Sequence, residues 1–333
     1  MVAVSKSKVP ITVLTGFLGA GKTTVLNQLL AQESMAGSAV IVNEFGAISI
    51  DAELIVGVDE DVLQINNGCI CCTVRSDLVS TISDLLARRP DIRRILIETT
   101  GLADPAPVIQ SFIIDETLSA STQLDAIVTV VDPAHIERWL ADTSSDENVA
   151  AEQIAFADVV VISKVDLVGD AQLAKCRASI RAINPMVKIV QAANGVVDPL
   201  SIVDVRAFDL KNCLAIEPLL LSDLEHEHDA GIVSVEVRQE TPLDGAAFFR
   251  WLNAFVTAER ASILRTKGIL SIAGEARRWV FHGVHMTLEG RPGRPWSPAE
   301  KRSSAIVFIG RGLDAEKIRE QIAAMSASRS LVA

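Results

Sequence analysis

Two hydrophobic patterns follow each other along the chain and change at about residue 200. Before that point, short β-branched runs that are apolar on both faces alternate with longer amphipathic stretches. Such runs are typical of a parallel sheet covered by helices on both faces. Strands are expected at Val9–Thr15, Ala39–Asn43, Ile92–Glu98, Ala126–Asp132, Val159–Ser163 and Val187–Gln191. Helices are expected near Lys22–Gln32, Ser76–Arg88, Asp146–Ala157 and Ala171–Ile183.

The second pattern predicts a smaller α+β domain. It follows an acidic stretch, Asn212–Val237, which contains no Lys or Arg and is interpreted as including a linker. Strands are expected at Ile232–Val237, Ala261–Ile272, Trp279–Leu288 and Ser304–Gly310, helices at Gly245–Thr257 and Asp314–Ser326, and a proline-rich loop at Arg291–Pro298. The predicted organisation is an α/β domain over 1–210, a linker over 211–230, the α+β domain over 231–326 and a tail over 327–333.

A phosphate-binding loop follows the first expected strand. The run G-F-L-G-A-G-K-T-T matches the pattern G-x-x-x-x-G-K-[ST], and it stands between an expected strand and an expected helix, which is the context that supports the motif. Backbone N–H groups and the helix N-terminus favour a bound phosphate. The predicted nucleotide-binding residues here are Gly16, Gly19, Ala20, Gly21, Lys22, Thr23 and Thr24. Lys22 is expected to reach the β and γ phosphates, and Thr23 to hold Mg²⁺.

A second phosphate-site motif, E-T-T-G, runs from Glu98 to Gly101 at the end of the third expected strand. In a nucleoside triphosphatase this position carries the carboxylate that orients the magnesium shell and a glycine whose N–H meets the γ-phosphate. We therefore assign Glu98 and Gly101, with Lys22, to catalysis. No glutamine stands out in the sequence as the residue that positions the attacking water, so slow intrinsic hydrolysis is expected.

The run S-K-V-D from Ser163 to Asp166 indicates guanine as the base. GTPases carry Asn-Lys-x-Asp at this place, where the Asp carboxylate accepts two hydrogen bonds that adenine cannot supply, and the Lys164 stem would lie along the base. Ser163 replaces the asparagine, so the contact of that residue is expected to be weakened or lost. Asn194 could supply a further N–H to the guanine carbonyl. The alternative is an ordinary turn with a solvated Lys and Asp.

A cluster of thiols is the second strong signal. The run N-N-G-C-I-C-C-T places Cys69, Cys71 and Cys72, three of the five cysteines, within four residues. The spacing differs from the paired C-x-x-C of a closed zinc site. If the segment is extended, Cys69 and Cys71 point to one face and Cys72 to the other. Two or three thiolates leave a position for water or for a side chain such as Glu44. An open, mixed-ligand site suits a metal that must leave again, whereas small buried residues are the alternative.

The position of this cluster suggests coupling to the nucleotide. The motif N-E-F-G at Asn43 follows the second expected strand, where GTPases keep their first switch, and the thiols lie between it and Glu98. A metal bound there would respond to the γ-phosphate, because switch segments order around it.

Composition excludes some classes of binding partner and indicates the cellular compartment. The formal net charge of −11 argues against nucleic acid and against anionic membrane surfaces. No apolar run reaches the length of a membrane span, and the first residues lack the regions of a signal peptide. A cytoplasmic protein with reduced cysteines is therefore expected, in which clustered thiols indicate metal or redox chemistry.

Together, the phosphate loop, N-E-F-G, G-C-I-C-C from Gly68 and E-T-T-G resemble the CobW-type family of metallochaperone GTPases. The C-terminal half agrees, because L-R-T-K-G-I-L from Leu264, F-H-G-V from Phe281 and V-F-I-G from Val307 resemble that family's C-terminal domain. The resemblance covers nearly the whole chain. It implies a zinc-responsive GTPase that delivers Zn²⁺, or Co²⁺, to a client metalloprotein, with Cys69, Cys71 and Cys72 as the metal site.

The chain departs from the family pattern in three respects. Ser163 is one. Apolar Val42 and Ala47 stand where some relatives carry carboxylates, and only E-H-E-H-D from Glu225 remains of a His-rich loop. For His226 and His228 a solvated acidic linker is favoured over an auxiliary metal site. The remaining histidines and cysteines stand apart from these motifs and are interpreted as structural: His135, Cys176, Cys213, His282 and His285.

Two other functions stay open at the level of sequence. A metal store or sensor with vestigial GTPase activity would bind metal indifferently to nucleotide. A phosphate-loop kinase or ligase with structural cysteines would turn over a small acceptor. The sequence names neither the client protein nor the oligomeric state, and a homo-oligomer stays open.

Overall fold

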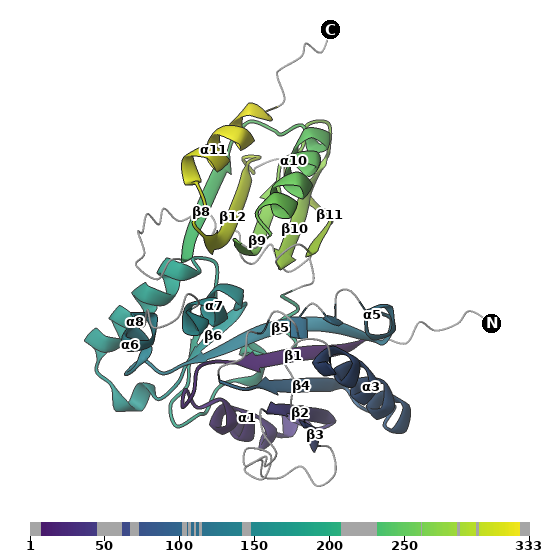
Figure 1. The fold of residues 1–333 in the computed structure, drawn as a ribbon, viewed down its shortest axis with the longest axis vertical. Helices are drawn as coiled ribbons and strands as arrows, with labels where there is room; N and C mark the ends of the chain where they lie inside the picture. Colours follow the sequence, from purple (N-terminus) through teal and green to yellow (C-terminus); the bar gives the residue numbers. More distant parts are fainter. Residues whose placement is uncertain are drawn as a thin grey trace, which may run out of the picture. The chain divides into compact units, whose positions relative to one another are not determined.

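The computed structural model describes residues 8–44, 62–66, 73–101, 105, 108–109, 111–112, 115–141, 148–207, 232–260, 262–284, 287–297 and 300–326. The chain divides into two compact units, Met1–Ser179 with Val187–Arg206, and Ile180–Met186 with Ala207–Ala333 (Figure 1).

The first unit is built on a parallel sheet. In the described part of the chain its strand order is β3-β2-β4-β1-β5-β6-β7, and every neighbouring pair is parallel. The strands are β1 (Val9–Thr15), β2 (Ser38–Glu44), β3 (Val62–Asn66), β4 (Arg94–Thr99), β5 (Thr122–Val131), β6 (Val159–Ile162) and β7 (Lys188–Gln191). The helices are α1 (Lys22–Leu30), η1 (Glu33–Met35), α3 (Thr73–Arg88), α5 (Glu116–Ser121), α6 (Ile136–Leu140), α7 (Val149–Phe156), η2 (Val165–Leu167), α8 (Asp170–Ile183) and η3 (Pro199–Ser201).

The predicted parallel α/β architecture is confirmed, and each of the six expected strands is present. The all-aliphatic run of β6 is buried along its whole length, as a central strand with helices on both faces requires. The sequence missed β3, a short strand whose central residue, Gln64, interrupts the apolar pattern, and which pairs with β2 at the sheet edge. It also missed α5 and α6, and α3 begins at Thr73 rather than at the expected Ser76.

Near the amino ends of the strands, the buried carboxylate of Asp125 binds the segment 204–206, which ends the first unit. Asp125, at 2% exposure, accepts hydrogen bonds from the Thr12 hydroxyl at 3.0 Å and from the Arg206 N–H. Burial raises the pKa of Asp125, although these donors oppose the rise. Arg94 pairs with Asp204 at 2.8 Å. Asp204 and Arg206 have φ of +54° and +51°, so the segment takes a tight, left-handed path.

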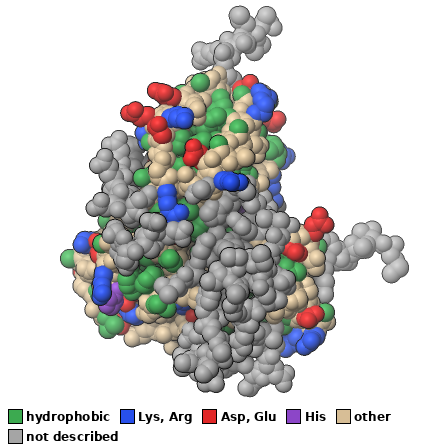
Figure 2. Space-filling model, in the orientation of Figure 1, with side chains coloured by type: hydrophobic (Ala, Val, Ile, Leu, Met, Phe, Trp, Pro, Cys, Tyr) green, Lys and Arg blue, Asp and Glu red, His purple; other side chains and the backbone are tan. Residues whose placement is uncertain are grey.

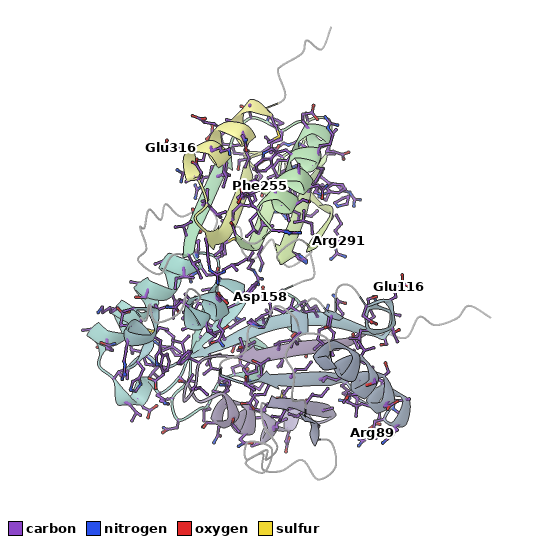
Figure 3. The ribbon with its side chains drawn as sticks, in the orientation of Figure 1. Arg89, Glu116, Asp158, Phe255, Arg291 and Glu316 are labelled. Atoms are coloured by element: carbon purple, nitrogen blue, oxygen red, sulfur yellow. The ribbon has the colours of Figure 1, made fainter. Side chains whose placement is uncertain are left out.

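The described part of the second unit is an antiparallel sheet with two helices, α10 and α11. In the described residues its strand order is β11-β10-β9-β12-β8. Its elements are β8 (Ile232–Gln239), α10 (Gly245–Ala258), β9 (Ile263–Leu270), β10 (Arg277–Val284), β11 (Thr287–Pro295), β12 (Ser304–Arg311) and α11 (Ala315–Ala324). Phe248 and Leu252 of α10 and Ile318 of α11 pack with Phe281 and Phe308 in one core. Phe255 lies further along α10 (Figure 3). The centre of its ring is 5.4 Å from that of Phe308.

The expected proline-rich loop over Arg291–Pro298 is wrong for most of its length. Residues 287–295 form β11, which pairs antiparallel with β10. The proline signal misled because β11 lies at the edge of the sheet, where a strand tolerates residues that lack an N–H donor. The expected strand Trp279–Leu288 is correspondingly divided between β10 and β11.

An arginine–glutamate cluster closes one end of this sheet. Glu300 pairs with the fully buried Arg278 and with Arg294, and accepts the Ser297 N–H at 3.1 Å. The Arg278 guanidinium lies 4.3 Å from the centre of the Trp296 ring. Burial works to raise the pKa of Glu300, but the hydrogen bonds from Arg278, Ser297 and Arg294 outweigh it and lower the pKa to about 2.

Glu300→Gln is expected to destabilise the second unit by about 2 kcal/mol at pH 7, because buried Arg278 would lose this carboxylate partner. The folded pKa of about 2 lies below the ordinary value of 4.5. The carboxylate therefore contributes stability that is complete above pH 4.5 and is lost as the pH falls toward 2. The difference between wild type and variant should be constant near neutrality and shrink below pH 4.5. Urea unfolding followed by tryptophan fluorescence measures it.

Glu240→Gln is the matched control. Glu240 pairs with Lys301 at 2.6 Å, but both side chains are 73% exposed. Its replacement should change the free energy of unfolding by less than about 0.5 kcal/mol at every pH. Equal effects of the two variants would contradict the assigned role of Glu300.

Candidate functional site

The phosphate loop joins β1 to α1 and is shaped by close packing. A Cβ at Gly16 would lie 2.2 Å from the Val130 carbonyl oxygen, so this position admits only glycine. Lys22, at 9% exposure, begins α1, and its Nζ donates to the carbonyls of Gly16 at 2.8 Å and Phe17 at 3.3 Å. The ammonium group is thus held within the loop and next to the helix N-terminus, where an anion binds most favourably.

The pair predicted for magnesium is brought together. Thr23, on α1, donates its hydroxyl to Glu98 Oε1 at 2.8 Å, although the two residues are 75 positions apart. Glu98, at the end of β4, is 3% exposed. A hydroxyl and a carboxylate oxygen side by side are hard oxygen donors of the kind that Mg²⁺ prefers. The donor set therefore fits a magnesium ion.

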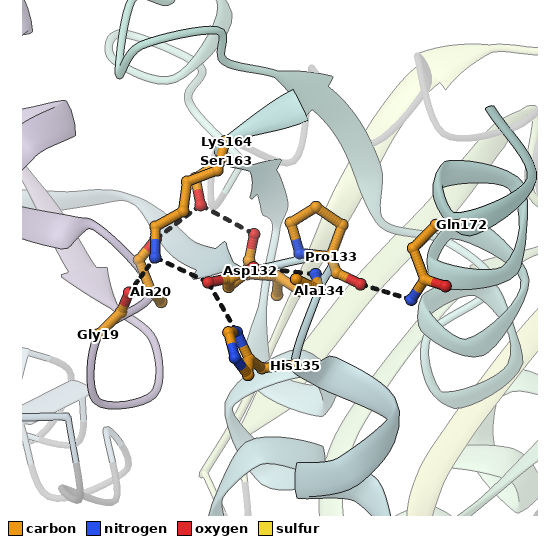
Figure 4. A network of polar contacts seen from close by, with 10 residues as sticks. Gly19, Ala20, Asp132, Pro133, Ala134, His135, Ser163, Lys164 and Gln172 are labelled. Carbon is orange, nitrogen blue, oxygen red and sulfur yellow. Dashed lines mark hydrogen bonds and ion pairs between the residues drawn. The ribbon is translucent and has the colours of Figure 1, made fainter. Parts of the chain in front are cut away.

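The residues predicted for the base also hold the phosphate loop (Figure 4). The Ser163 hydroxyl, 2% exposed, donates to the Ala20 carbonyl at 2.6 Å, and Lys164 Nζ donates to the Gly19 carbonyl at 2.7 Å. Ser163, which stands in place of the asparagine of the guanine motif, therefore contacts the phosphate loop directly. The end of β6 lies close enough to the loop for a short hydroxyl to reach.

Asp132 is a site residue that sequence reasoning missed. It is 2% exposed and accepts hydrogen bonds from Lys164 Nζ at 2.7 Å and from the Ala134 N–H at 2.9 Å. His135 Nδ1 lies 3.1 Å from the same carboxylate. Burial would raise the pKa of Asp132, but the hydrogen bonds from Lys164, Ala134 and His135 together lower it. The available signal was a carboxylate directly after a buried strand, at the carboxyl edge of the sheet.

His135, which the sequence analysis interpreted as structural, has contacts on two sides. Besides its contact with Asp132, its ring stacks on Trp139 of α6 at 5.7 Å. Trp139 in turn contacts the ring of Phe17 in the phosphate loop at 4.7 Å. Gln172 of α8 donates to the Pro133 carbonyl at 2.7 Å, which fixes the turn that carries Asp132 (Figure 4). The phosphate loop is thus supported from the β5–α6 turn as well as from β6.

Asp166 and Asn194 meet at the other end of the site. Asp166 is exposed, and its Oδ1 accepts the Asn194 N–H at 2.9 Å. A Cβ at the following Gly195 would lie 2.8 Å from Thr24 Cγ2, so this loop packs against the start of α1. The carboxylate predicted to read guanine is therefore oriented by the loop after β7.

The predicted thiol ligands lie outside the described residues. Residues 67–72, with Cys69, Cys71 and Cys72, connect Asn66 at the end of β3 to Thr73 at the start of α3. Glu44 ends β2, and its side chain is also outside the description. The same holds for Cys213, His226, His228 and His285.

Within the described residues, no group of three or more His, Cys, Asp or Glu could hold a metal ion. Cys176 is fully buried on α8, and burial raises its thiol pKa to about 12, in keeping with a structural role. No described helix is long and apolar enough to cross a membrane. On the face drawn in Figure 2, the Lys and Arg side chains that are described lie scattered among Asp and Glu and form no continuous basic field.

Comparison with known proteins gives consistent results over both units. Residues 10–191 match the model of the CobW/HypB/UreG nucleotide-binding domain, and residues 232–326 match the C-terminal domain of the cobalamin synthesis protein CobW. The chain is 33% identical to the zinc chaperone YjiA of Escherichia coli K12 over 95% of this chain and 98% of that protein. It is 35% identical to the zinc chaperone CobW of Pseudomonas aeruginosa over 95% and 91%. The crystal structure of Zn(II)-bound YjiA GTPase from Escherichia coli superposes with a TM-score of 0.77 at 26% identity, covering 97% of this chain and all of that one.

Proposed function

Because the chain belongs to the CobW/HypB/UreG family, we propose that it is a GTPase metallochaperone that couples GTP binding and hydrolysis to the transfer of zinc to a client metalloprotein. The observation that supports this proposal most is the convergence of three predicted groups at one edge of the parallel sheet. These are the phosphate loop with Lys22, the Thr23–Glu98 pair, and the Ser163–Lys164 pair that holds the loop carbonyls.

Each residue has a defined part in the proposed hydrolysis. Lys22 would exchange its loop carbonyls for the β and γ phosphates, and Thr23 and Glu98 would hold magnesium. The ion supplies positive charge that neutralises the charge developing on the phosphate oxygens. The Gly101 N–H would contact the γ-phosphate. Because catalysis here consists of positioning and charge stabilisation, a site without an assigned water-positioning residue should hydrolyse GTP slowly.

Base selection is proposed for Asp166, Lys164 and Asn194. The Asp166 carboxylate would accept both N–H groups of the guanine edge, while its Oδ1 keeps the Asn194 N–H. The Lys164 stem would lie along the base, held in place by Asp132. Since Ser163 and Lys164 bind consecutive loop carbonyls, the base and phosphate subsites form one connected framework.

For the transferred metal we propose Cys69, Cys71 and Cys72, with Glu44 as a further ligand. The segment that contains the cysteines joins β3 to α3, and Glu44 is the partner of Asn66 in the β2–β3 pair. Thiolates with a carboxylate suit Zn²⁺, with Co²⁺ close behind it. Two relatives that align with 95% of this chain are named zinc chaperones, which favours zinc.

The test is the zinc affinity in two nucleotide states. Competition with a chromophoric chelator in Mg-GDP and in Mg with a non-hydrolysable GTP analogue should give dissociation constants that differ by about tenfold, a coupling of roughly 1.4 kcal/mol. Cys71→Ser should lower the affinity in both states. Cys176→Ser is the matched control and should change neither, because this thiol is fully buried.

Equal zinc affinity in the two states would overturn the transfer model and favour a metal store or sensor. Turnover that depends on a small acceptor and is indifferent to Cys71→Ser would instead favour a kinase or ligase. Both outcomes can be read from the same preparations.

A further inference from the structure

A buried glutamine contacts the segment that follows β4. Gln153, on α7, is 1% exposed, and its Nε2 donates to the Gly101 carbonyl at 3.3 Å. Gly101 ends the E-T-T-G motif, to which the proposed function assigns contact with the γ-phosphate. Gln153 itself belongs to none of the nucleotide-binding motifs described above.

Gly101 is fixed directly against the phosphate loop. It is buried, and a Cβ at this position would lie 2.7 Å from the Leu18 nitrogen and 2.8 Å from the Leu18 Cα. No side chain fits in that space, so the backbone of Gly101 and the backbone of the loop are in contact. A small displacement of Gly101 would therefore change its distance to anything that the loop holds.

The helix that presents Gln153 is itself capped at its N-terminus and tied to α6 and β5. Its N-cap residue Asn148 accepts the Ala151 N–H at 3.0 Å and donates to the carbonyls of Trp139 and Leu140 at the end of α6. The Thr129 hydroxyl of β5 donates to the Gln153 carbonyl at 2.7 Å. Neither the backbone of Gln153 nor α7 can shift without breaking these bonds, so the carboxamide meets Gly101 from a fixed point.

We infer that Gln153 is a positioning residue that holds Gly101 where its N–H meets the γ-phosphate, and thereby favours GTP over GDP. The inference rests on the proposed function. GDP lacks the only group that Gly101 would contact, so an effect that acts through Gly101 appears in GTP affinity and not in GDP affinity. A structural effect on the loop would appear in both.

The test uses Gln153→Met in the full-length protein, because methionine has a similar volume and lacks the N–H donor. Titration with fluorescent nucleotides in the presence of Mg²⁺ should show an affinity for a non-hydrolysable GTP analogue that is about fivefold lower, as expected for the loss of one buried hydrogen bond. The affinity for GDP should stay within about twofold. Gln32→Met is the matched control, since it removes a carboxamide bond to the Val197 carbonyl at 3.1 Å and should change neither affinity.

Each outcome decides the inference. Equal loss of both nucleotides, or no loss of either, would overturn it and leave the proposed function standing. Failure of the wild-type protein to bind GTP would instead remove the proposed function. If Gln153→Met does not unfold cooperatively at a midpoint near that of wild type, Gln153→Asn replaces it. This variant keeps the amide, but its shorter side chain moves the N–H donor away from the Gly101 carbonyl. The same selective loss of affinity for the GTP analogue is expected.

Discussion

Asp166→Asn is expected to lower GTP affinity by about 100-fold and to create affinity for xanthosine triphosphate. In the proposed site the Asp166 carboxylate would accept two N–H groups of guanine, whereas asparagine would set an amide donor against the exocyclic amine of the base. Xanthine carries a carbonyl at that position, which accepts from the asparagine amide. The Asn194 N–H would keep its acceptor, because Asn retains one oxygen. Competition binding with GTP, ATP and xanthosine triphosphate measures the change.

Asp170→Asn is the matched control for this change in base specificity. Asp170 is an exposed carboxylate four positions further along, at the first turn of α8, and its replacement should leave all three affinities within about twofold. Unchanged GTP binding by Asp166→Asn would show that the S-K-V-D run is only a turn. That was the alternative left open at the level of sequence.

Lys22→Ala is expected to slow GTP hydrolysis by about 10³-fold. The Lys22 ammonium group lies at the N-terminus of α1 and is largely buried. In such a setting one well-placed hydrogen-bond donor to the transition state raises the rate by about 10²- to 10³-fold, and the positive charge of the lysine adds further stabilisation. Single-turnover hydrolysis of Mg-GTP measures the rate. Thermal unfolding of the same sample is needed, because Lys22 also bonds the Gly16 and Phe17 carbonyls and its removal will loosen the empty loop.

Lys188→Ala is the corresponding control. Lys188 begins β7, is exposed, and donates to the Ser201 carbonyl at 3.0 Å, so its loss removes a lysine-to-carbonyl bond away from the phosphate loop. Its hydrolysis rate should equal that of wild type. A Lys22→Ala variant with a wild-type rate would place the chemistry elsewhere.

Sequence reasoning succeeded where the chemistry is local. The phosphate loop, Thr23 and the β-branched strands could be predicted because a short run of residues determines each of them. Thr23 and Glu98 were assigned to magnesium from two separate motifs, and the structure brings their side chains together. Residues whose role depends on what packs against them were missed, and Gln153 and Asp132 are the main examples. No local pattern separates a glutamine that holds a switch glycine from one that faces solvent.

The same reasoning failed where tertiary context overrides a local signal. The prolines of β11 predicted a loop, but an edge strand accommodates them. The hydrogen bond from the Ser163 hydroxyl to the Ala20 carbonyl was not predicted either, because it joins residues 143 positions apart in the chain.

Residues 204–206 are bound to the amino ends of the strands through Arg94 and Asp125. These contacts set the C-terminal boundary at which the nucleotide-binding domain can be exchanged as a unit. A protein that ended at Gly195, shortly after β7 (Lys188–Gln191), would keep every nucleotide motif but would lose the Arg206 N–H, one of the donors to Asp125. Asp125, which is 2% exposed and lies on the interior strand β5, would then keep the Thr12 hydroxyl but lose the backbone donors of residues 205 and 206. Recombination between relatives, and changes in the length of the connecting segment, should therefore be tolerated after Ala207 and resisted before it.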